Sequence, residues 1–149
     1  MGIGLLIGSD EMVARHFLEP RGQMFFKYDR AFGILRDEKL VGTILIHGFN
    51  GSNLELSYYG EGTMTAGVIR FLAKYGVKTF DPSRCTVITS KRNRRFIKSL
   101  QRLGFKLEGT QRCYYGKKDI IRNTGVRFVM FREQIDALAK LGSEYKEAI

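Results

Sequence analysis

The spacing of hydrophobic residues changes abruptly in the middle of the chain, and this change constrains the fold more than any other feature. Residues 53–59 alternate, which predicts a strand with two distinct faces. One face carries Leu54, Leu56 and Tyr58, and the other carries Glu55, Ser57 and Tyr59. From Ala66 onward apolar residues recur four positions apart, which predicts a helix that ends at Gly76. A strand that turns directly into a helix is typical of α/β proteins.

The same patterns along the rest of the chain predict a sheet flanked by helices. Helical spacing is found at residues 9–16, 92–103 and 133–141, with Ser9 expected to cap the first of these helices. Alternation predicts further strands at 31–36, 40–49, 85–89, 105–115 and 126–131, the first two as a β-hairpin. This order predicts an α/β (α+β) fold with a mixed sheet and helices packed on it.

Length and composition predict one domain over residues 1–149. The chain is 44% hydrophobic and contains no internal repeat or linker-like tract. It has no apolar run near the roughly 20 residues of a membrane span, and its first eight residues lack the basic start of a secretory signal. We therefore expect no membrane association and a cytoplasmic location. Cys85 and Cys113 match no metal-binding spacing, so we expect reduced thiols and no metal site.

The charge is more informative about partners. The chain has 25 basic and 15 acidic residues, a net charge of +10, and such a field attracts nucleic acid or a phosphate-rich cofactor. Basic residues gather on the helix predicted at 92–103 and just before it. These are Lys91, Arg92, Arg94, Arg95, Lys98 and Arg102. A phosphate site and an ordinary solvated helix face are both consistent with this pattern.

A glycine turn joins the 53–59 strand to the following helix. Gly60 and Gly62 let the backbone approach a ligand closely, and amide groups at a helix N-terminus suit a pyrophosphate. Thr63 and Thr65 can add hydroxyl donors. The same residues also describe a plain glycine turn followed by a threonine N-cap. The turn lacks the GxxxxGK[ST] spacing of a nucleotide-triphosphate loop and the third glycine of a dinucleotide fingerprint.

The segment after this turn resembles one protein family. Asn93 opens a helix that ends in Leu-Gly-Phe, and Glu-Gly and Arg112 follow. This run over residues 103–112 resembles the closing motif of the GNAT (Gcn5-related) N-acetyltransferase superfamily, and Val41-Gly42 fits a common pair in its hairpin. The resemblance covers roughly residues 40–132. It is nearest to the ribosomal-protein and small-molecule acetyltransferase branch and to short GNAT proteins of tailed bacteriophages; if the protein is viral, its location is the host cytoplasm. The resemblance implies the GNAT fold, a central mixed, mostly antiparallel sheet flanked by helices.

The resemblance implies that acetyl-CoA is the cofactor and that coenzyme A is released as a product. In the family's cofactor loop, Tyr59 takes the place of an arginine or glutamine, and Met64 the place of a small residue. The cofactor-binding residues implied in this way are Leu56, Tyr58, Tyr59, Gly60, Glu61, Gly62, Thr63, Met64, Thr65, Asn93 and Arg95.

Acetyl transfer needs a base for the amine, donors for the oxyanion and a proton for the thiolate. By resemblance, backbone amides of residues 56–58 polarise the thioester. Glu55 is the candidate base, although an exposed strand glutamate would look the same. Leu100 stands where many family members have a tyrosine acid, so Ser99, Tyr58, Tyr114 or solvent would substitute. The candidate catalytic residues are Glu55, Tyr58 and Ser99.

The sequence thus predicts an N-acetyltransferase that moves an acetyl group directly to a primary amine of a small molecule or protein, as a monomer or homodimer. One alternative is a GNAT-fold protein that modifies or binds nucleic acid, which the +10 charge would suit. A second is a non-catalytic binding module. Two tyrosine pairs either line an acceptor pocket or pack in the sheet; they are Tyr58 with Tyr59 and Tyr114 with Tyr115.

Overall fold

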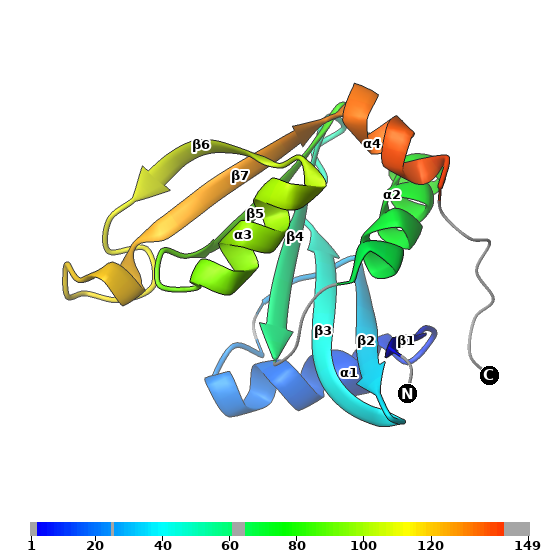
Figure 1. The fold of residues 1–149 in the computed structure, drawn as a ribbon. Helices are drawn as coiled ribbons and strands as arrows, with labels where there is room; N and C mark the ends of the chain where they lie inside the picture. The colour runs from blue at the N-terminus through cyan, green and yellow to red at the C-terminus, as the bar shows by residue number, and fades with distance from the viewer. Residues whose placement is uncertain (1–2, 25, 61–64, 142–149) are drawn as a thin grey trace.

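A computed structural model describes residues 3–24, 26–60 and 65–141. Within these residues a seven-stranded sheet has the order β1-β2-β3-β4-β5-β7-β6 (Figure 1). The strands are β1 Ile3–Leu6, β2 Arg30–Arg36, β3 Lys39–His47, β4 Asn53–Gly60, β5 Arg84–Ser90, β6 Lys106–Gln111 and β7 Gly125–Phe131. The helices are α1 Asp10–Leu18, α2 Ala66–Phe80, α3 Arg94–Leu103 and α4 Arg132–Ala139, with short 3₁₀ turns η1 Glu19–Arg21 and η2 Ile121–Asn123.

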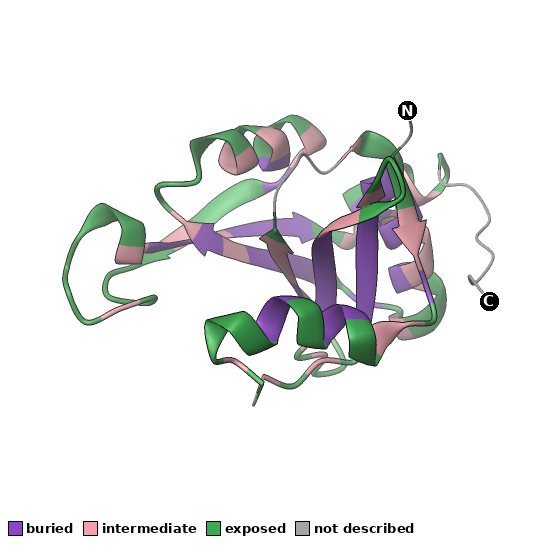
Figure 2. Ribbon diagram, turned by 90° about the horizontal axis from the view of Figure 1, so that it is seen from below, coloured by how far each residue is buried: buried purple, intermediate pink, exposed green. Residues whose placement is uncertain are grey.

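Helices cover both faces of the sheet. Seen from below in Figure 2, α1 lies on one side of the strands and α3 on the other, and buried residues fill the layer between them. The main contacts of α1 are with β2 and β3. In the described part of the chain, no helix is long and apolar enough to cross a membrane.

The alternation predicted for β4 is confirmed by its packing. Leu54, Leu56 and Tyr58 face the larger core, which includes Ile69 and Leu72 of α2. Tyr59 instead packs with the smaller core, formed under α1 by residues such as Val13, Phe17 and Leu45. The two faces of this one strand therefore belong to two different environments.

The sheet is mixed and mostly antiparallel, as predicted. Among the described strands only β4 and β5 run parallel, and their registered pairs stop at Leu56 with Val87. β4 continues to Gly60 and β5 to Ser90, so the two strands diverge beyond this point (Figure 1). Beyond it, backbone groups that would otherwise hydrogen-bond between β4 and β5 face the space between the two strands.

The predicted end of α2 at Gly76 is wrong, because the helix continues to Phe80. Gly76 is buried inside the helix, and Phe80 packs edge-on against Phe49 with ring centroids 5.3 Å apart. The helix ends at Asp81, a left-handed residue whose amide donates to the carbonyls of Gly76 and Val77. Tertiary packing thus overrides the glycine stop signal.

Several other boundaries differ from the sequence prediction. β1 was not expected, and it forms because its four residues pair with β2. Ser9 occupies the N-cap of α1, where its carbonyl accepts the first helical hydrogen bond from Val13, but its side chain makes no capping hydrogen bond. α1 extends to Leu18 and α3 starts at Arg94. β6 ends at Gln111, four residues early, and its register shifts between Leu107 and Gly109.

Gly60 is required by the sheet itself. Its φ is +114°, and a Cβ at this position would lie 2.4 Å from the carbonyl oxygen of Val41 and 2.6 Å from Cα of Gly42. Gly42 is its partner in the β3–β4 register. The two glycines therefore let the end of this ladder close tightly.

We expect Gly60→Ala to lower the free energy of unfolding by about 2–4 kcal/mol, because it combines a strained φ with a backbone clash. Urea denaturation measures the loss. Gly4→Ala is the matched control, since Gly4 lies in β1 with nothing within 4 Å of an added Cβ. Equal stability of the two variants would contradict this role for Gly60.

Candidate functional site

A cleft opens where β4 and β5 diverge. Its volume is about 620 Å³, and it is bounded by β4, the end of β5 and α3. The lining residues are Arg21, Tyr58, Tyr59, Gly60, Thr89, Arg92, Asn93, Arg94, Arg95, Phe96 and Ser99. Six of the residues predicted from the sequence therefore meet in one place: Tyr58, Tyr59, Gly60, Asn93, Arg95 and Ser99.

One wall is built by the turn from β5 into α3. Asn93 occupies the N-cap of α3, and its side-chain amide donates to Oγ1 of Thr89 at 2.9 Å. The Asn93 backbone amide donates to the carbonyl of Ser90 at 2.9 Å. The Asn93 side chain therefore holds the strand rather than capping the helix, and the first-turn residues Arg94, Arg95 and Phe96 line the cleft.

Aromatic rings form the floor on the helix side. The ring of Tyr58 stacks on Phe96, with centroids 5.2 Å apart and planes inclined by 19°. The Tyr58 hydroxyl lies close to Gly42, where an added Cβ would be 3.3 Å from it. Ser99 is on the same helix, and its hydroxyl donates to the carbonyl of Arg95 at 3.1 Å.

The opposite wall comes from the N-terminal part of the chain. Arg21 of η1 donates to the carbonyl of Phe17 at 2.7 Å, and its guanidinium lies 5.2 Å from the ring centroid of Tyr59. Burial raises the pKa of the Tyr59 hydroxyl, an effect that Arg21 partly opposes. The cleft therefore receives residues from both faces of the sheet.

The remaining predicted cofactor residues are placed differently. Leu56 is buried in the larger core. The hydroxyl of Thr65 accepts from the amide of Val68 at 3.3 Å, so Thr65 is the N-cap of α2. Glu61, Gly62, Thr63 and Met64 lie outside the described residues.

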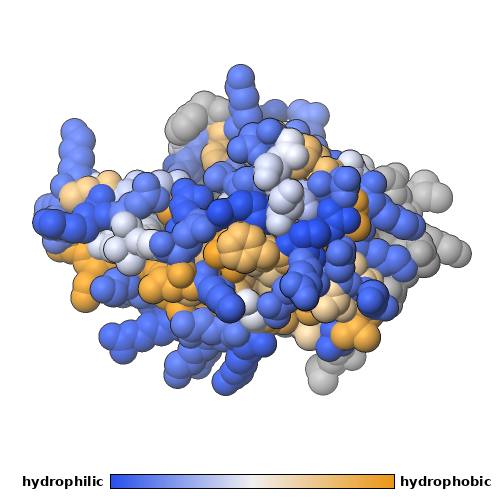
Figure 3. All heavy atoms as spheres, turned by 90° about the horizontal axis from the view of Figure 1, so that it is seen from above, coloured by the Kyte–Doolittle hydropathy of each residue, from blue (hydrophilic) through white to orange (hydrophobic). Residues whose placement is uncertain are grey.

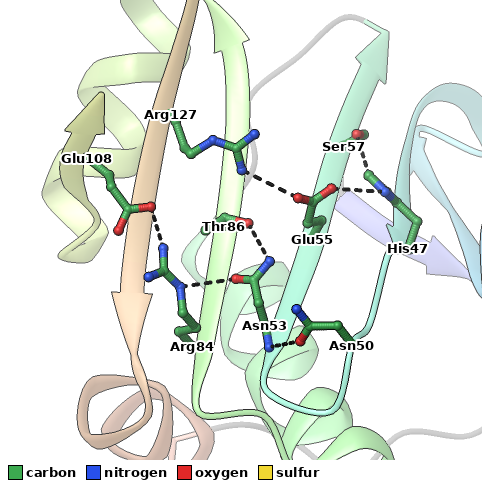
Figure 4. A network of polar contacts seen from close by, with 9 residues as sticks. All are labelled: His47, Asn50, Asn53, Glu55, Ser57, Arg84, Thr86, Glu108 and Arg127. Carbon is green, nitrogen blue, oxygen red and sulfur yellow. Dashed lines mark hydrogen bonds and ion pairs between the residues drawn. The ribbon is translucent and has the colours of Figure 1, made fainter. Parts of the chain in front are cut away.

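Glu55 lies on the other face of β4, within a polar network (Figure 4). One carboxylate oxygen is 3.5 Å from Nδ1 of His47, and the other is 3.4 Å from a guanidinium nitrogen of Arg127. Nε2 of His47 is 2.7 Å from the hydroxyl of Ser57. Glu55 does not line the cleft, but Ser57 lies between it and Tyr59 on the same strand face.

The protonation of His47 follows from its surroundings. Burial lowers the pKa of His47, and Glu55 and Asp29 oppose this shift. Because a carboxylate only accepts hydrogen bonds, the contact with Glu55 favours the tautomer that carries its proton on Nδ1. Nε2 is then the acceptor, and Ser57 donates its hydroxyl proton to it.

The network continues toward the edge of the sheet. Asn53 donates to Thr86 at 3.2 Å and accepts from Arg84 at 3.2 Å, and Arg84 pairs with Glu108. Within the described ranges, no cluster of three or more His, Cys, Asp or Glu residues could hold a metal ion. Cys85 is buried, and burial raises its pKa to about 12, so its thiol is inert at neutral pH.

Sequence reasoning missed several of these residues. Arg21 and Thr89 carry no motif and reach the cleft only through the tertiary fold. His47, Ser57 and Arg127 were not identified either, although alternation along β4 already places Ser57 beside Glu55. The position of His47 follows from its register with Glu55, which the hairpin alone does not fix.

Comparisons with known proteins are informative at the level of structure only. A scan against protein-family models finds no match. A search of the curated proteins finds none that is similar in sequence. Among solved structures, a spermidine N-acetyltransferase SpeG chimera from Vibrio cholerae and hSSAT superposes with a TM-score of 0.68 at 12% identity, covering 92% of this chain and 99% of the other.

Two further structures are similar. Mutant forms of the spermidine/spermine N-acetyltransferase SpeG from Vibrio cholerae give a TM-score of 0.61 at 11% identity, covering 78% of this chain and 75% of that one. A GCN5-related N-acetyltransferase from Brucella melitensis gives 0.60 at 18% identity over 74% of this chain. The chain spans 54% of the Brucella protein and 63% of two other solved chains. The protein has the fold of GNAT acetyltransferases.

The buried His47 makes stability depend on pH. Its pKa is lowered from 6.5 in the folded state, so the unfolded chain binds a proton more readily. Its contribution to stability is complete above pH 6.5 and is lost as the pH falls toward the folded-state pKa. We expect the unfolding free energy of His47→Gln to fall less steeply than that of the parent protein as the pH is lowered below 6.5. Urea denaturation at several pH values measures both slopes.

His16→Gln is the control, because it removes the other histidine from the exposed surface of α1. The control is expected to keep the slope of the parent protein. An unchanged slope in His47→Gln would contradict the assignment.

Proposed function

We propose that the protein is an acetyl-CoA-dependent N-acetyltransferase that acts on a primary amine of a small molecule or protein. The observation that carries this proposal is the cleft at the divergence of β4 and β5. Its volume of about 620 Å³ is within the range of small-molecule and cofactor sites.

The chemistry of the cleft fits a phosphate-bearing ligand. Arg92, Arg94 and Arg95 line one side, and all three are exposed. The first turn of α3 contains no acidic residue, so the positive end of the helix adds to their field. Tyr58 and Phe96 supply an apolar surface for the remainder of such a ligand.

The separation of β4 from β5 also leaves backbone N–H groups of β4 available where the thioester would react. In this proposal, amides of residues 56–58 hold the carbonyl oxygen of the thioester, because a fixed N–H group stabilises developing negative charge. Acetyl-CoA supplies the activated acyl group. Tyr58 and Ser99 line the same cleft and are the candidates for returning a proton to the departing sulfur.

Glu55 is proposed as the base on the acceptor side. Its carboxylate is half-buried and is held by Arg127 and His47, which fix its orientation. It takes a proton from the attacking amine, directly or through water, and releases it to solvent. The polar face around Glu55 then receives the acceptor, and the cleft receives the acyl donor.

The neighbouring structures suggest where an acceptor screen should begin. Two of them are described as spermidine or spermidine/spermine N-acetyltransferases. A cationic amine would be attracted to Glu55. Polyamines, simple primary amines and lysine-containing peptides therefore form the first panel.

Arg95→Glu tests the cofactor cleft. Loss of a charge-assisted contact and added repulsion should weaken acetyl-CoA binding at least about tenfold by calorimetric titration. Arg36→Glu is the control, because it makes the same charge change on the exposed end of β2 and should leave the affinity nearly unchanged. No binding of acetyl-CoA or coenzyme A to the parent protein would overturn the proposal in favour of a non-catalytic module.

Glu55→Gln tests the base. With the best acceptor of the panel, we expect kcat to fall about 10²-fold while the Kd for acetyl-CoA stays the same, because only proton transfer is removed. Glu38→Gln, at the exposed β2–β3 turn, is expected to match the parent protein. A Glu55→Gln enzyme with unchanged kcat would exclude Glu55 as the base.

A further inference from the structure

The positive charge of the molecule is concentrated in one part of the fold. From Arg84 at the start of β5 to Phe131 at the end of β7, the chain has 13 basic residues and two acidic ones, a net charge of +11. All other residues together have 12 basic and 13 acidic side chains, a net charge of −1. The +10 of the protein is therefore the property of one segment, not of the whole surface.

Most of these charges have no internal partner. Arg84, Arg112 and Arg127 pair with Glu108, Asp119 and Glu55. Among the described residues, the other ten form no ion pair, and all ten are exposed. They are Lys91, Arg92, Arg94, Arg95, Lys98, Arg102, Lys106, Lys117, Lys118 and Arg122.

Two parts of the segment meet to form one surface. We call residues 112–124, between β6 and β7, the β6–β7 arm; it is exposed almost throughout (Figure 2). The arm contacts the turn into α3, where Ser90 donates to the carbonyl of Arg122 at 2.7 Å and the Lys91 amide donates to the carbonyl of Thr124 at 2.9 Å. The end of the arm and the start of α3 therefore lie side by side (Figure 1).

Exposed aromatic rings lie among these cations. Tyr114 and Tyr115 are each 46% exposed and pack edge to face, with centroids 4.8 Å apart. Arg112 precedes them, and Lys117 and Lys118 follow. Seen from the side of α4, β6 and β7, the molecule is mostly hydrophilic, with hydrophobic groups in separate areas rather than one apolar patch (Figure 3).

We propose that the β6–β7 arm and the outer face of α3 bind single-stranded nucleic acid. Unpaired, exposed cations attract the phosphate backbone, and adjacent exposed tyrosines can stack on unpaired bases. An acidic protein would satisfy the cations but would make no use of the two rings. The surface adjoins the cofactor cleft, which Arg92, Arg94 and Arg95 line, and extends beyond it, because Lys117, Lys118 and Arg122 do not line the cleft.

The test is binding of a fluorescently labelled 20-nucleotide oligouridine, measured by anisotropy over a range of salt concentrations without acetyl-CoA. Its outcome is therefore independent of the acetyltransferase proposal. The variant Lys117→Ala/Lys118→Ala/Arg122→Ala should weaken binding about tenfold or more at low salt. It should also make the slope of log K against log salt shallower by about 2.

A matched control removes the same three charges elsewhere. Lys27→Ala/Arg36→Ala/Lys39→Ala also removes two lysines and one arginine, all exposed, from the connection before β2 and the β2–β3 hairpin. This control should retain most of the affinity. Equal losses in the two triple variants, or no binding of the parent protein at low salt, would overturn the proposal.

The tyrosines distinguish nucleic acid from other polyanions. Tyr114→Ala should weaken oligouridine binding about fivefold or more, because stacking on one base is lost. It should leave binding of polyglutamate of equal charge unchanged. Polyglutamate binding as tight as that of oligouridine, or an equal loss of both ligands, would contradict assignment to nucleic acid. Thermal unfolding confirms that each variant is folded.

Discussion

The parallel pairing of β4 with β5 is the constraint on which the rest of the structure depends. Every other pairing between strands that the structure describes is antiparallel, so a helix must cross over between β4 and β5. That helix, α2, covers the larger core. Because the pairing stops at Leu56 and Val87, the strands separate beyond these two residues, which themselves stay packed in the larger core. The cleft forms because β4 and β5 are paired along their first residues and separate along their last ones.

The two faces of β4 have different surroundings. Tyr58 lies against α3 on the side of the larger core, whereas Glu55 and Ser57 lie in the polar network. α1 makes its main contacts with β2 and β3. In the proposed function, this period of two places Tyr58 beside the acyl donor and Glu55 beside the amine.

The sequence predicts the order of the elements well, because alternation and helical spacing are local properties. Its errors are at Gly76, where packing of Phe80 extends the helix, and at β1, which is defined only by its pairing with β2. For the cleft, local motifs identified Tyr58, Asn93 and Ser99, since they lie on the strand and helix that carry the resemblance. Arg21 and His47 were not predictable, because each reaches its place through the register and packing of distant segments.

The register shift in β6 has a consequence for association between molecules. β6 is the last strand of the sheet, so its outer side presents unpaired backbone groups to solvent. The shift between Leu107 and Gly109 bends this edge, and Lys106 and Glu108 place charges along it. A bent and charged edge is a poor template for a strand from another chain. This edge of the sheet is thereby protected from the edge-to-edge growth that leads to amyloid.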